Sequence, residues 1–500
     1  MAKKKALNKW PKKVKTMSSK YLPTIGIECH VQLRTKTKLF SGADNDARTA
    51  KPNTLINHID FGLPGALPVF NREALHLAVR AALALGVEPQ LFSTFDRKHY
   101  FYPDLPMGYQ ITQYDQPVII GGQVEYTLNG ELKRVSITRA HLEADAGKSS
   151  HPGTKDYSLV DLNRAGTPLL EIVSEPDMHS AAEARAFAEE LYLLMCYAEV
   201  TDGDLYHGNM RFDVNVSLSD NDKLGVRSET KNLNSFRAVE KAVDYEIKRQ
   251  SELLERNQLV VQETRGWNEA KQKTIPQRSK ENADDYRYMP DPDLPPIEID
   301  PKYIKQVESE MPKLPAFWRN ELSALGLSSS QSNILLEAGV NFAEAKYMDL
   351  VLDFSSRGLN TKALVNWLVN VDIPLVKTDS SLIRTDRNKL YLDVLNLVEA
   401  GKLSSTNTKE LIAAALKSSE VLSNISAYAS QAGLLQQSDS SQLEETIKEI
   451  LFTNAEAVKD VKAGQDKAIG FLIGQVMAKT SGQANPEVAR QLIEKLIKQA

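Results

Sequence analysis

Strict alternation of apolar and polar residues marks segment 25–34, which reads IGIECHVQLR. The apolar residues share one parity: Ile25, Ile27, Cys29, Val31 and Leu33. The polar ones share the other: Glu28, His30, Gln32 and Arg34. Because side chains alternate between the faces of a β-strand, a period of two predicts a strand with one polar face. A carboxylate beside an imidazole suits a hard metal ion or an acid–base pocket, and a solvated sheet face is the alternative interpretation.

The same kind of polar face recurs in segments 135–145, 210–218 and 226–231. Its members are Arg139, His141, Glu143 and Asp145, then Arg211, Asp213, Asn215 and Ser217, and finally Arg227, Glu229 and Lys231. A solvated face would more often carry Lys, Thr, Ser and Gln. Repeated carboxylates, cations and amides therefore favour one polar pocket built across a sheet.

Helical periodicity appears first in two short stretches and then takes over. Segment 71–85 begins at a capping Asn71 and ends at Gly86, and segment 180–198 begins with Ser180 and Glu183 as a capping box. The proline-rich stretch 291–296 closes the mixed region. Beyond about residue 313 the chain reads as helices, with Ser-rich breaks at 328–332 and 418–441 and a final amphipathic helix over 486–500. We therefore expect an α+β body followed by an all-α half.

Composition fits a soluble protein of several domains. The chain has 500 residues, 42% hydrophobic and 25% charged, and no apolar run approaches the roughly 20 residues of a membrane span, so no membrane is expected. Two cysteines, Cys29 and Cys196, supply no disulfide framework, which favours a reducing cytoplasm.

Charge is unevenly distributed. The net charge is −4, yet residues 1–20 hold eight lysines and no acid, which leaves −12 for the rest of the chain. This head lacks the features of a targeting peptide, and we interpret residues 1–22 as a disordered basic arm. The arm either contacts RNA phosphates or is a solvated tail without function.

Several motifs narrow the chemistry. Segment 95–117 mixes tyrosines with Asp, Arg, Lys and Gln, and we interpret it as a loop that either packs on the surface or holds a nucleotide. The AGKS of 146–149 lacks the first glycine of a phosphate loop, although Lys148 can still reach a phosphate as a point charge. Unpaired cysteines argue against zinc, whereas clustered carboxylates favour Mg²⁺ and phosphoryl transfer.

Taken together, long collinear motifs resemble one family, the B subunit of the bacterial aspartyl/glutamyl-tRNA amidotransferase. The matching segments are IGIECHVQL, GLPGALPV, FDRKHYFYPD, DAGKS, DLNRAGTPLLEIVSEPD, KNLNSF, ETR, DDYRY and, near the C-terminus, FLIGQVMAKTSGQANP. They cover nearly the whole chain from about residue 24.

The resemblance implies an ATP-dependent carbon–nitrogen ligase with glutamine as amide donor. It would convert Glu-tRNA(Gln) to Gln-tRNA(Gln), Asp-tRNA(Asn) to Asn-tRNA(Asn), or both, by phosphorylating the side-chain carboxylate with ATP and Mg²⁺. Ammonia would arrive through a channel from an amidase subunit, and a small third subunit would complete a heterotrimer. The implied domains are a cradle-shaped α+β catalytic domain (23–312), a helical domain (313–430) and a YqeY-like helical tail that binds tRNA (431–500).

The resemblance also implies site residues. Glu28, His30, Glu143 and Glu229 are the candidates for the catalytic metal and phosphoryl site, with Asp213 and Asn215 completing the metal shell. Candidates for the nucleotide or the channel are Lys98, Tyr100, Tyr102 and Lys148.

Two departures from the family pattern stand out. Ala144 occupies a position that is usually acidic, and segment 41–63 has no cysteine, so the zinc knuckle of many members is expected to be absent. If the alanine at position 144 abolished metal binding, the chain would be a tRNA-binding module without chemistry. A generic metal-dependent hydrolase would fit the pocket but not the helical half.

Overall fold

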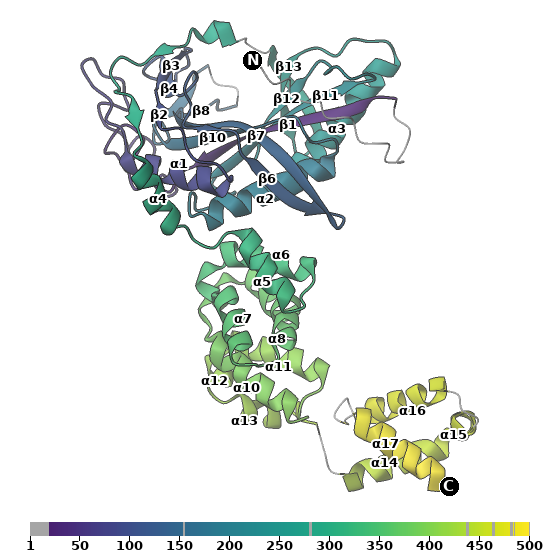
Figure 1. Ribbon diagram of the computed structural model, residues 1–500. Helices are drawn as coiled ribbons and strands as arrows, with labels where there is room; N and C mark the ends of the chain where they lie inside the picture. Colours follow the sequence, from purple (N-terminus) through teal and green to yellow (C-terminus); the bar gives the residue numbers. More distant parts are fainter. Residues whose placement is uncertain are drawn as a thin grey trace. The chain divides into compact units, whose positions relative to one another are not determined.

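The computed structural model describes residues 20–153, 156–279, 283–436, 440–462, 466–480, 484 and 486–499. The predicted basic arm falls almost entirely outside these residues, and residue 22 already belongs to the first strand. The described chain forms two compact units that divide after Pro315 (Figure 1). The first is α+β and the second is all-α, as the sequence predicts.

A large sheet organises the first unit, with strand order β14-β13-β12-β11-β1-β10-β7-β5 and β6 paired to β7. Its strands are β1 (Leu22–Gln32), β5 (Ile119–Ile120), β6 (Gln123–Leu128), β7 (Glu131–Ala144), β10 (Pro168–Ser174), β11 (Met210–Ser219), β12 (Ser228–Leu233), β13 (Glu263–Asn268) and β14 (Lys273–Ser279). Neighbours are antiparallel except β12 and β13. The four alternating segments of the sequence thus become β1, β7, β11 and β12, although Arg227 lies exposed before β12.

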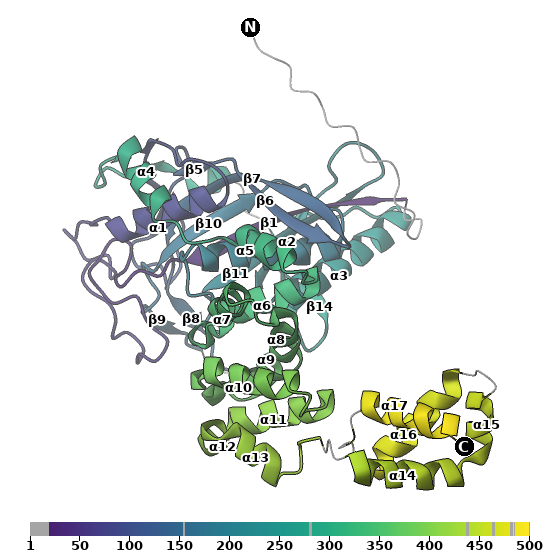
Figure 2. The same ribbon diagram turned by 60° about the horizontal axis from the view of Figure 1, so that its bottom comes forward.

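The apolar parity of β1 is buried, with no member more than 1% exposed. Helices α2 (Ala181–Tyr197) and α3 (Phe236–Glu255) cover this face of the sheet (Figure 2). The ring of Phe236 joins the layers, because it contacts Phe212 of β11 and Tyr192 of α2. Burial of such rings drives the packing of helix on sheet and leaves the opposite face for polar groups.

Helix ends follow local chemistry. Helix α1 (Arg72–Ala84) begins where Asn71 accepts a hydrogen bond from the amide of Glu73 (2.9 Å), and Gly86 follows it with φ +76°. The capping box predicted at 180–183 is only half formed. Ser180 accepts from the Glu183 amide, but the Glu183 carboxylate accepts from the amide of His179.

The loop predicted at 95–117 is confirmed for residues 100–108 and 113–117 but is wrong for two short strands. Strands β3 (Asp96–His99) and β4 (Tyr109–Thr112) form a small sheet with β15 (Met289–Pro290). Arg97 fixes this sheet through Asp291 (2.9 Å), a contact 194 residues away that local pattern does not show. The remaining elements of this unit are α4 (Pro301–Ser309), η1 (Ala283–Tyr286) and the pairs β2 (Phe92–Ser93) with β16 (Ile297–Glu298) and β8 (Lys148–Ser150) with β9 (Leu159–Asp161).

The second unit is helical. Its α-helices are α5 (Pro315–Ala324), α6 (Ser329–Asn341), α7 (Tyr347–Ser356), α8 (Thr361–Trp367), α9 (Ile373–Thr378), α10 (Arg387–Glu399), α11 (Ser405–Lys417), α12 (Ser419–Ser423), α13 (Ile425–Gln431), α14 (Ser440–Thr453), α15 (Ala455–Lys462), α16 (Asp466–Lys479) and α17 (Pro486–Gln499). The Ser-rich stretch 328–332 is not a break, because Ser328 caps α6 with a complete capping box. Helices α12 and α13 likewise lie within 418–441.

A buried network of hydrogen bonds joins helices in the middle of this unit. Asp372, at the end of a π-helical turn (Leu368–Asp372), accepts two hydrogen bonds from Arg387 (3.0 Å each) and one each from the hydroxyls of Tyr347 and Tyr391 (2.8 Å). Both charged groups are at least 96% buried, so each depends on the other for solvation.

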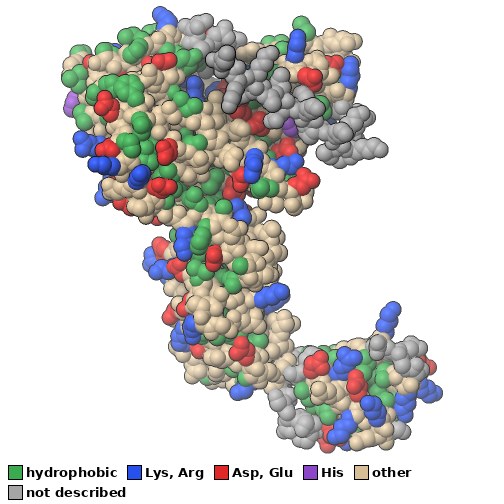
Figure 3. Space-filling view, viewed as in Figure 1, with side chains coloured by type: hydrophobic (Ala, Val, Ile, Leu, Met, Phe, Trp, Pro, Cys, Tyr) green, Lys and Arg blue, Asp and Glu red, His purple; other side chains and the backbone are tan. Residues whose placement is uncertain are grey.

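Helices α14 to α17 close around a core of their own that includes Ile447, Leu472, Val476 and Ile493. The amphipathic helix predicted at 486–500 is confirmed as α17. Lys and Arg side chains lie among Asp and Glu side chains on the face of this bundle shown in Figure 3. Within the described part of the chain, no helix has the length and apolar character to cross a membrane.

Candidate functional site

The polar face of the large sheet carries one continuous row of functional groups across its four central strands. Register places Arg211 of β11 beside His30 of β1, His30 beside Glu171 of β10, and Glu171 beside His141 of β7. Directly opposed residues of antiparallel strands point to the same face. Sheet pairing therefore brings His30 next to Glu171 and Arg211, each of which lies more than 100 positions away in the chain.

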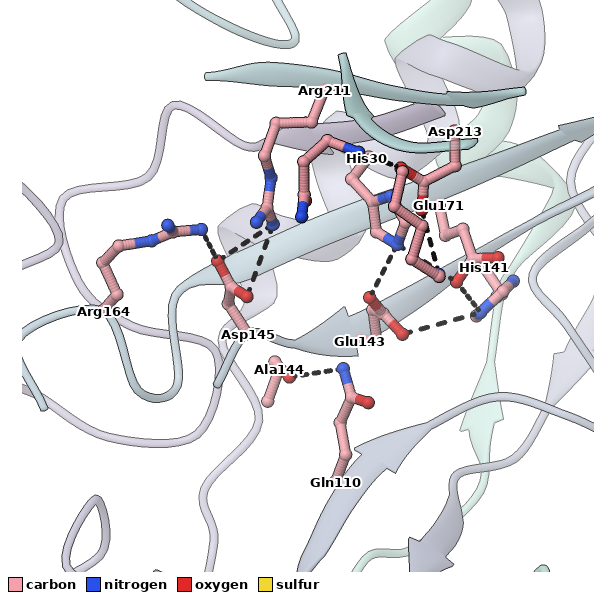
Figure 4. A network of polar contacts seen from close by, with 12 residues as sticks. His30, Gln110, His141, Glu143, Ala144, Asp145, Arg164, Glu171, Arg211 and Asp213 are labelled. Carbon is pink, nitrogen blue, oxygen red and sulfur yellow. Dashed lines mark hydrogen bonds and ion pairs between the residues drawn. The ribbon is translucent and has the colours of Figure 1, made fainter. Parts of the chain in front are cut away.

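Two imidazoles and two carboxylates make the first cluster, and Figure 4 shows them turned toward one another. His30 Nε2 lies 3.6 Å from an oxygen of Glu143 and 3.6 Å from one of Glu171, and His141 Nε2 lies 3.4 Å from Glu171. One ligand atom each of His30, Glu143 and Glu171 fall within 4.8 Å of one another. This spacing is small enough for a single cation to contact all three.

Burial and repulsion act on the two carboxyls of this cluster in opposite directions. Burial, followed by the charge of Glu171, raises the pKa of Glu143. Burial alone would raise the pKa of Glu171 as well, but His141 and His30 outweigh it and hold that pKa well below its usual range. Two carboxylates this close do not both ionise readily without a compensating cation.

A second cluster lies beside the first, because Glu28 stands two residues before His30 on the same face of β1. One oxygen each of Glu28, Asp213 and Glu229 fall within 4.8 Å of one another. Lys231 reaches Asp213 (3.1 Å) and Glu229 (3.3 Å), and Asn215 donates to Glu28 (2.9 Å). Burial, then the charges of Glu171 and Glu229, raises the pKa of Glu28. Three carboxylates thus share one ammonium group.

The donor set of both clusters fits a magnesium ion. Mg²⁺ prefers oxygen ligands from carboxylates and amides, and the two clusters together offer five carboxylates, of which Asp213 and Glu229 also pair with Lys231. The amide oxygen of Asn215 is buried next to Glu28 and has no hydrogen-bond partner among the described residues. A buried acceptor without a donor is costly, and a cation would satisfy it.

Lys98 of β3 covers the first cluster from the small sheet. Its ammonium group lies 4.8 Å from the ring centre of Tyr286 and 6.0 Å from that of Tyr100. Burial alone would lower the pKa of Lys98, but Tyr288, Glu143 and Glu171 raise it above its usual value. The hydroxyl of Tyr100 donates to Gln110 (3.1 Å), so this candidate is tied to the wall of the pocket.

Asp145 extends the pocket past the end of β7. It pairs with Arg164 and with Arg211 (3.3 Å), as Figure 4 shows. Glu143 and Asp145 therefore face the pocket together, as parity predicts. Ala144 between them lines a small cavity of about 40 Å³, which Asp145 also lines, and its carbonyl accepts from Gln110 (2.9 Å). Because side chains alternate along an extended chain, an acidic side chain at position 144 would point away from the clusters that Glu143 and Asp145 face.

Comparison with known proteins decides the family. Residues 23–305 match the GatB/GatE catalytic domain, and residues 349–497 match the GatB domain. The B subunit of the aspartyl/glutamyl-tRNA(Asn/Gln) amidotransferase from Trichormus variabilis is 41% identical over 96% of this chain and 98% of its own length. The proteins of the same name from Coxiella burnetii and Persephonella marina are 43% and 40% identical, each over 95% of this chain and 99% of its own. The chain belongs to this family of amidotransferase B subunits.

Most residues that the family resemblance nominated converge in the structure. Those brought together on the polar face are Glu28, His30, Glu143, Asp213, Asn215 and Glu229, with Lys98 and Tyr100 above them. Two candidates lie elsewhere. Tyr102 is 48% exposed, although its ring contacts Tyr100, and Lys148 is exposed in a separate cavity.

Sequence reasoning left Glu171, His141 and Lys231 out of the proposed site. The sequence does contain a signal that could have identified Glu171, because Glu171 is the one charged residue in the buried strand PLLEIVS of β10. An isolated charge inside a strand with two buried faces requires a partner. His141 and Lys231 lay on predicted polar faces, but only strand order shows which neighbours they meet.

Proposed function

We propose that this chain is the B subunit of an amidotransferase that converts Glu-tRNA(Gln) to Gln-tRNA(Gln), Asp-tRNA(Asn) to Asn-tRNA(Asn), or both. It would use ATP and Mg²⁺ to activate the side-chain carboxylate and would work in a heterotrimer with an amidase subunit and a small third subunit. The observation that carries the proposal is the row Arg211–His30–Glu171–His141 with its two flanking carboxylate clusters. Family membership supports it, since the relatives carry this activity in their names.

The chemistry needs two steps. The carboxylate oxygen of the charged amino acid attacks the γ-phosphorus of ATP, and ADP leaves. Ammonia, which the amidase releases from glutamine, then attacks the acyl carbon, and the phosphate leaves with the oxygen it holds. Both reactants of the first step are anions, so the site must screen their charges.

Each group on the polar face has a part in this scheme. The clusters around His30 and Glu28 would hold Mg²⁺, which screens phosphate charge and orients the γ-phosphoryl group when bound. Lys98 and Arg211 would screen the carboxylate and the acyl phosphate, because both are held over the first cluster. The tyrosines around Lys98 would limit access of water and so protect the acyl phosphate from hydrolysis.

RNA binding would rest on a different part of the chain. Exposed Lys and Arg side chains on α14 to α17 could bind phosphates without reading sequence, although Asp and Glu side chains lie among them (Figure 3). The acidic first unit would take only the charged end of the tRNA. The compartment that we propose is the cytoplasm, since both cysteines are free thiols.

The decisive experiment uses the complex reconstituted with the amidase and the small third subunit. Glutamine, Mg²⁺ and Glu-tRNA(Gln) or Asp-tRNA(Asn) are supplied with and without ATP, and the amino acid released from the tRNA is identified. Glu28→Gln should abolish ATP-dependent product while tRNA affinity in a filter-binding assay stays within about twofold. Glu131→Gln, on an exposed part of β7, is the matched control and should behave as wild type. Equal loss of catalysis and tRNA binding in Glu28→Gln would remove the catalytic assignment and leave a binding module.

A further inference from the structure

Each carboxylate of the second cluster has one oxygen held by a neutral hydrogen-bond donor. The three pairs are Glu28 with the side-chain amide of Asn215 (2.9 Å), Asp213 with the backbone amide of Asn232 (2.8 Å) and Glu229 with the hydroxyl of Thr264 (3.0 Å). Hydrogen bonds of this kind fix the orientation of the groups that hold a metal ion. The first two donors belong to β11 and β12, which carry the cluster, whereas Thr264 comes from β13.

Thr264 lies directly beside Glu229, because β12 and β13 pair in parallel with these two residues in register. Their exposed fractions are 2% and 4%, so bulk water has little access to replace the hydroxyl. The hydroxyl donates to one oxygen of Glu229, and the ammonium group of Lys231 lies 3.3 Å from the other oxygen. The two groups together set the plane of this carboxylate.

The residues on either side of Thr264 anchor β13 to helix α3. Arg265 is 6% exposed, and its guanidinium lies 3.1 Å from the carboxylate of Glu246 in that helix. Glu263 pairs with Arg265 and lies 3.7 Å from Arg249 of the same helix. Because side chains alternate along a strand, the outer residues of the ETR motif hold β13 on the helix while the middle one faces the cluster.

We propose that Thr264 is a positioning residue for the amidotransferase reaction, which acts through Glu229 by fixing the orientation of a carboxylate that would hold Mg²⁺. The inference rests on the proposed function, in which the second cluster binds this cation. Loss of the hydroxyl lets the carboxylate of Glu229 turn further toward the ammonium group of Lys231. Its oxygens then no longer stand where the cation needs them, and the affinity for the cation falls.

The test compares Thr264→Val with Thr264→Ser in the complex with the amidase and the small third subunit. Valine keeps the branched shape without the hydroxyl, and serine keeps the hydroxyl. Binding of Mn²⁺, followed by the electron paramagnetic resonance of the free ion with Mg²⁺ as competitor, reports the site without turnover. Thr264→Val should raise the Kd for both ions about tenfold, and Thr264→Ser should stay within about threefold of wild type.

Steady-state kinetics of the same variants separate positioning from binding of the RNA. In Thr264→Val the Mg²⁺ concentration for half-maximal amide formation should rise about tenfold, while KM for aminoacyl-tRNA stays within about twofold. A double-mutant cycle with Glu229→Ala, which removes both oxygens, shows whether Thr264 acts through Glu229. Thr264→Val should then add less than about twofold to the loss of Mn²⁺ affinity that Glu229→Ala causes.

Thr230→Val is the matched control. Thr230 neighbours Glu229 on β12 and is 1% exposed, and its hydroxyl is buried without a hydrogen-bond partner among the residues that the structure describes. The same substitution at this position removes a buried hydroxyl that does not touch the cluster. The Mn²⁺ affinity and the Mg²⁺ requirement of Thr230→Val should therefore equal those of wild type.

The outcomes separate this inference from the function on which it rests. Wild-type Mn²⁺ affinity and Mg²⁺ requirement in Thr264→Val would overturn the inference and leave the proposed function standing. Equal losses in Thr264→Val and Thr264→Ser, or an equal loss in Thr230→Val, would assign the effect to packing and also overturn it. If the wild-type complex forms no amide with ATP, the proposed function fails and the inference with it.

Thr264→Cys carries the test if the valine variant does not fold. Its thiol is a weak donor of similar size, so its Kd for Mn²⁺ should exceed that of Thr264→Ser. Equal Kd values for these two variants would overturn the inference in that case. Circular dichroism and the melting temperature of each complex establish which variants are folded.

Discussion

Replacing Glu171 by Gln tests the assigned site at a residue that sequence reasoning left out. The substitution keeps the shape and one oxygen ligand but removes a charge that lies 3.6 Å from His30 and 3.4 Å from His141. At an effective dielectric constant of about 20, a unit charge about 4 Å from a unit positive charge contributes about 4 kcal/mol. Loss of Glu171 also relieves its repulsion with Glu143, which offsets part of this figure.

The expected net loss is therefore about 1.4–2.8 kcal/mol of cation binding, or about 10–100-fold in affinity. In the reconstituted complex the Mg²⁺ concentration for half-maximal amide formation should rise by that factor, while KM for aminoacyl-tRNA stays within about twofold. Glu175→Gln, on the same segment just past β10, controls for loss of a carboxylate and should leave the Mg²⁺ requirement unchanged. A wild-type Mg²⁺ requirement in Glu171→Gln would refute the placement of a cation between Glu171 and its neighbours.

Three further predictions concern stability and the departure at position 144. Asp372→Ala should lower the free energy of unfolding of the second unit by about 3–5 kcal/mol in urea titrations, because it leaves the charge of Arg387 buried and unpaired; a loss below about 1 kcal/mol would contradict this. Burial alone would raise the pKa of Glu246, but Arg249 and hydroxyl donors lower it below the usual value of 4.5. The ionised carboxylate therefore contributes to the free energy of unfolding above pH 4.5, and this stabilisation is lost as the pH falls through the lowered pKa. In urea titrations at about pH 6 and about pH 4, the free energy of unfolding should change less with pH in Glu246→Gln than in wild type. An equal change in both proteins would refute this role of Glu246. Ala144→Glu should leave the Mg²⁺ requirement unchanged and cost about 1–3 kcal/mol of stability by overpacking the small cavity that Ala144 lines; a lower Mg²⁺ requirement would show that position 144 reaches the clusters.

Local pattern predicted the elements best where one face is buried. The alternation at 25–34 and 210–218 predicted β1 and β11 and which residues of each are buried, because burial of one face fixes side-chain parity. Pattern missed the two short strands β3 and β4 within 95–117, which carry polar residues on both faces. Their strand form depends on pairing with each other and with β15, far along the chain.

Resemblance to the family supplied most of the candidate site residues, and the fold brings these candidates close together. It did not distinguish Lys148 and Tyr102, which lie away from the clusters, from Lys98 and Tyr100, which lie over them. Lys98, Tyr100 and Tyr102 lie in one motif, FDRKHYFYPD, and Lys148 lies in another, DAGKS. Only the path of the backbone after each motif separates them.

The sequence by itself determined the α+β and all-α halves, the strands with a polar face, and the types of group that this face offers. These properties depend on residues a few positions apart, and the burial of one face imposes them locally. The tertiary structure decided that Glu171 and His141 join His30 and that Lys231 neutralises only part of the second cluster. Strand order and register set these contacts, and they join residues that lie far apart in the chain, for which the sequence carries no periodic signal.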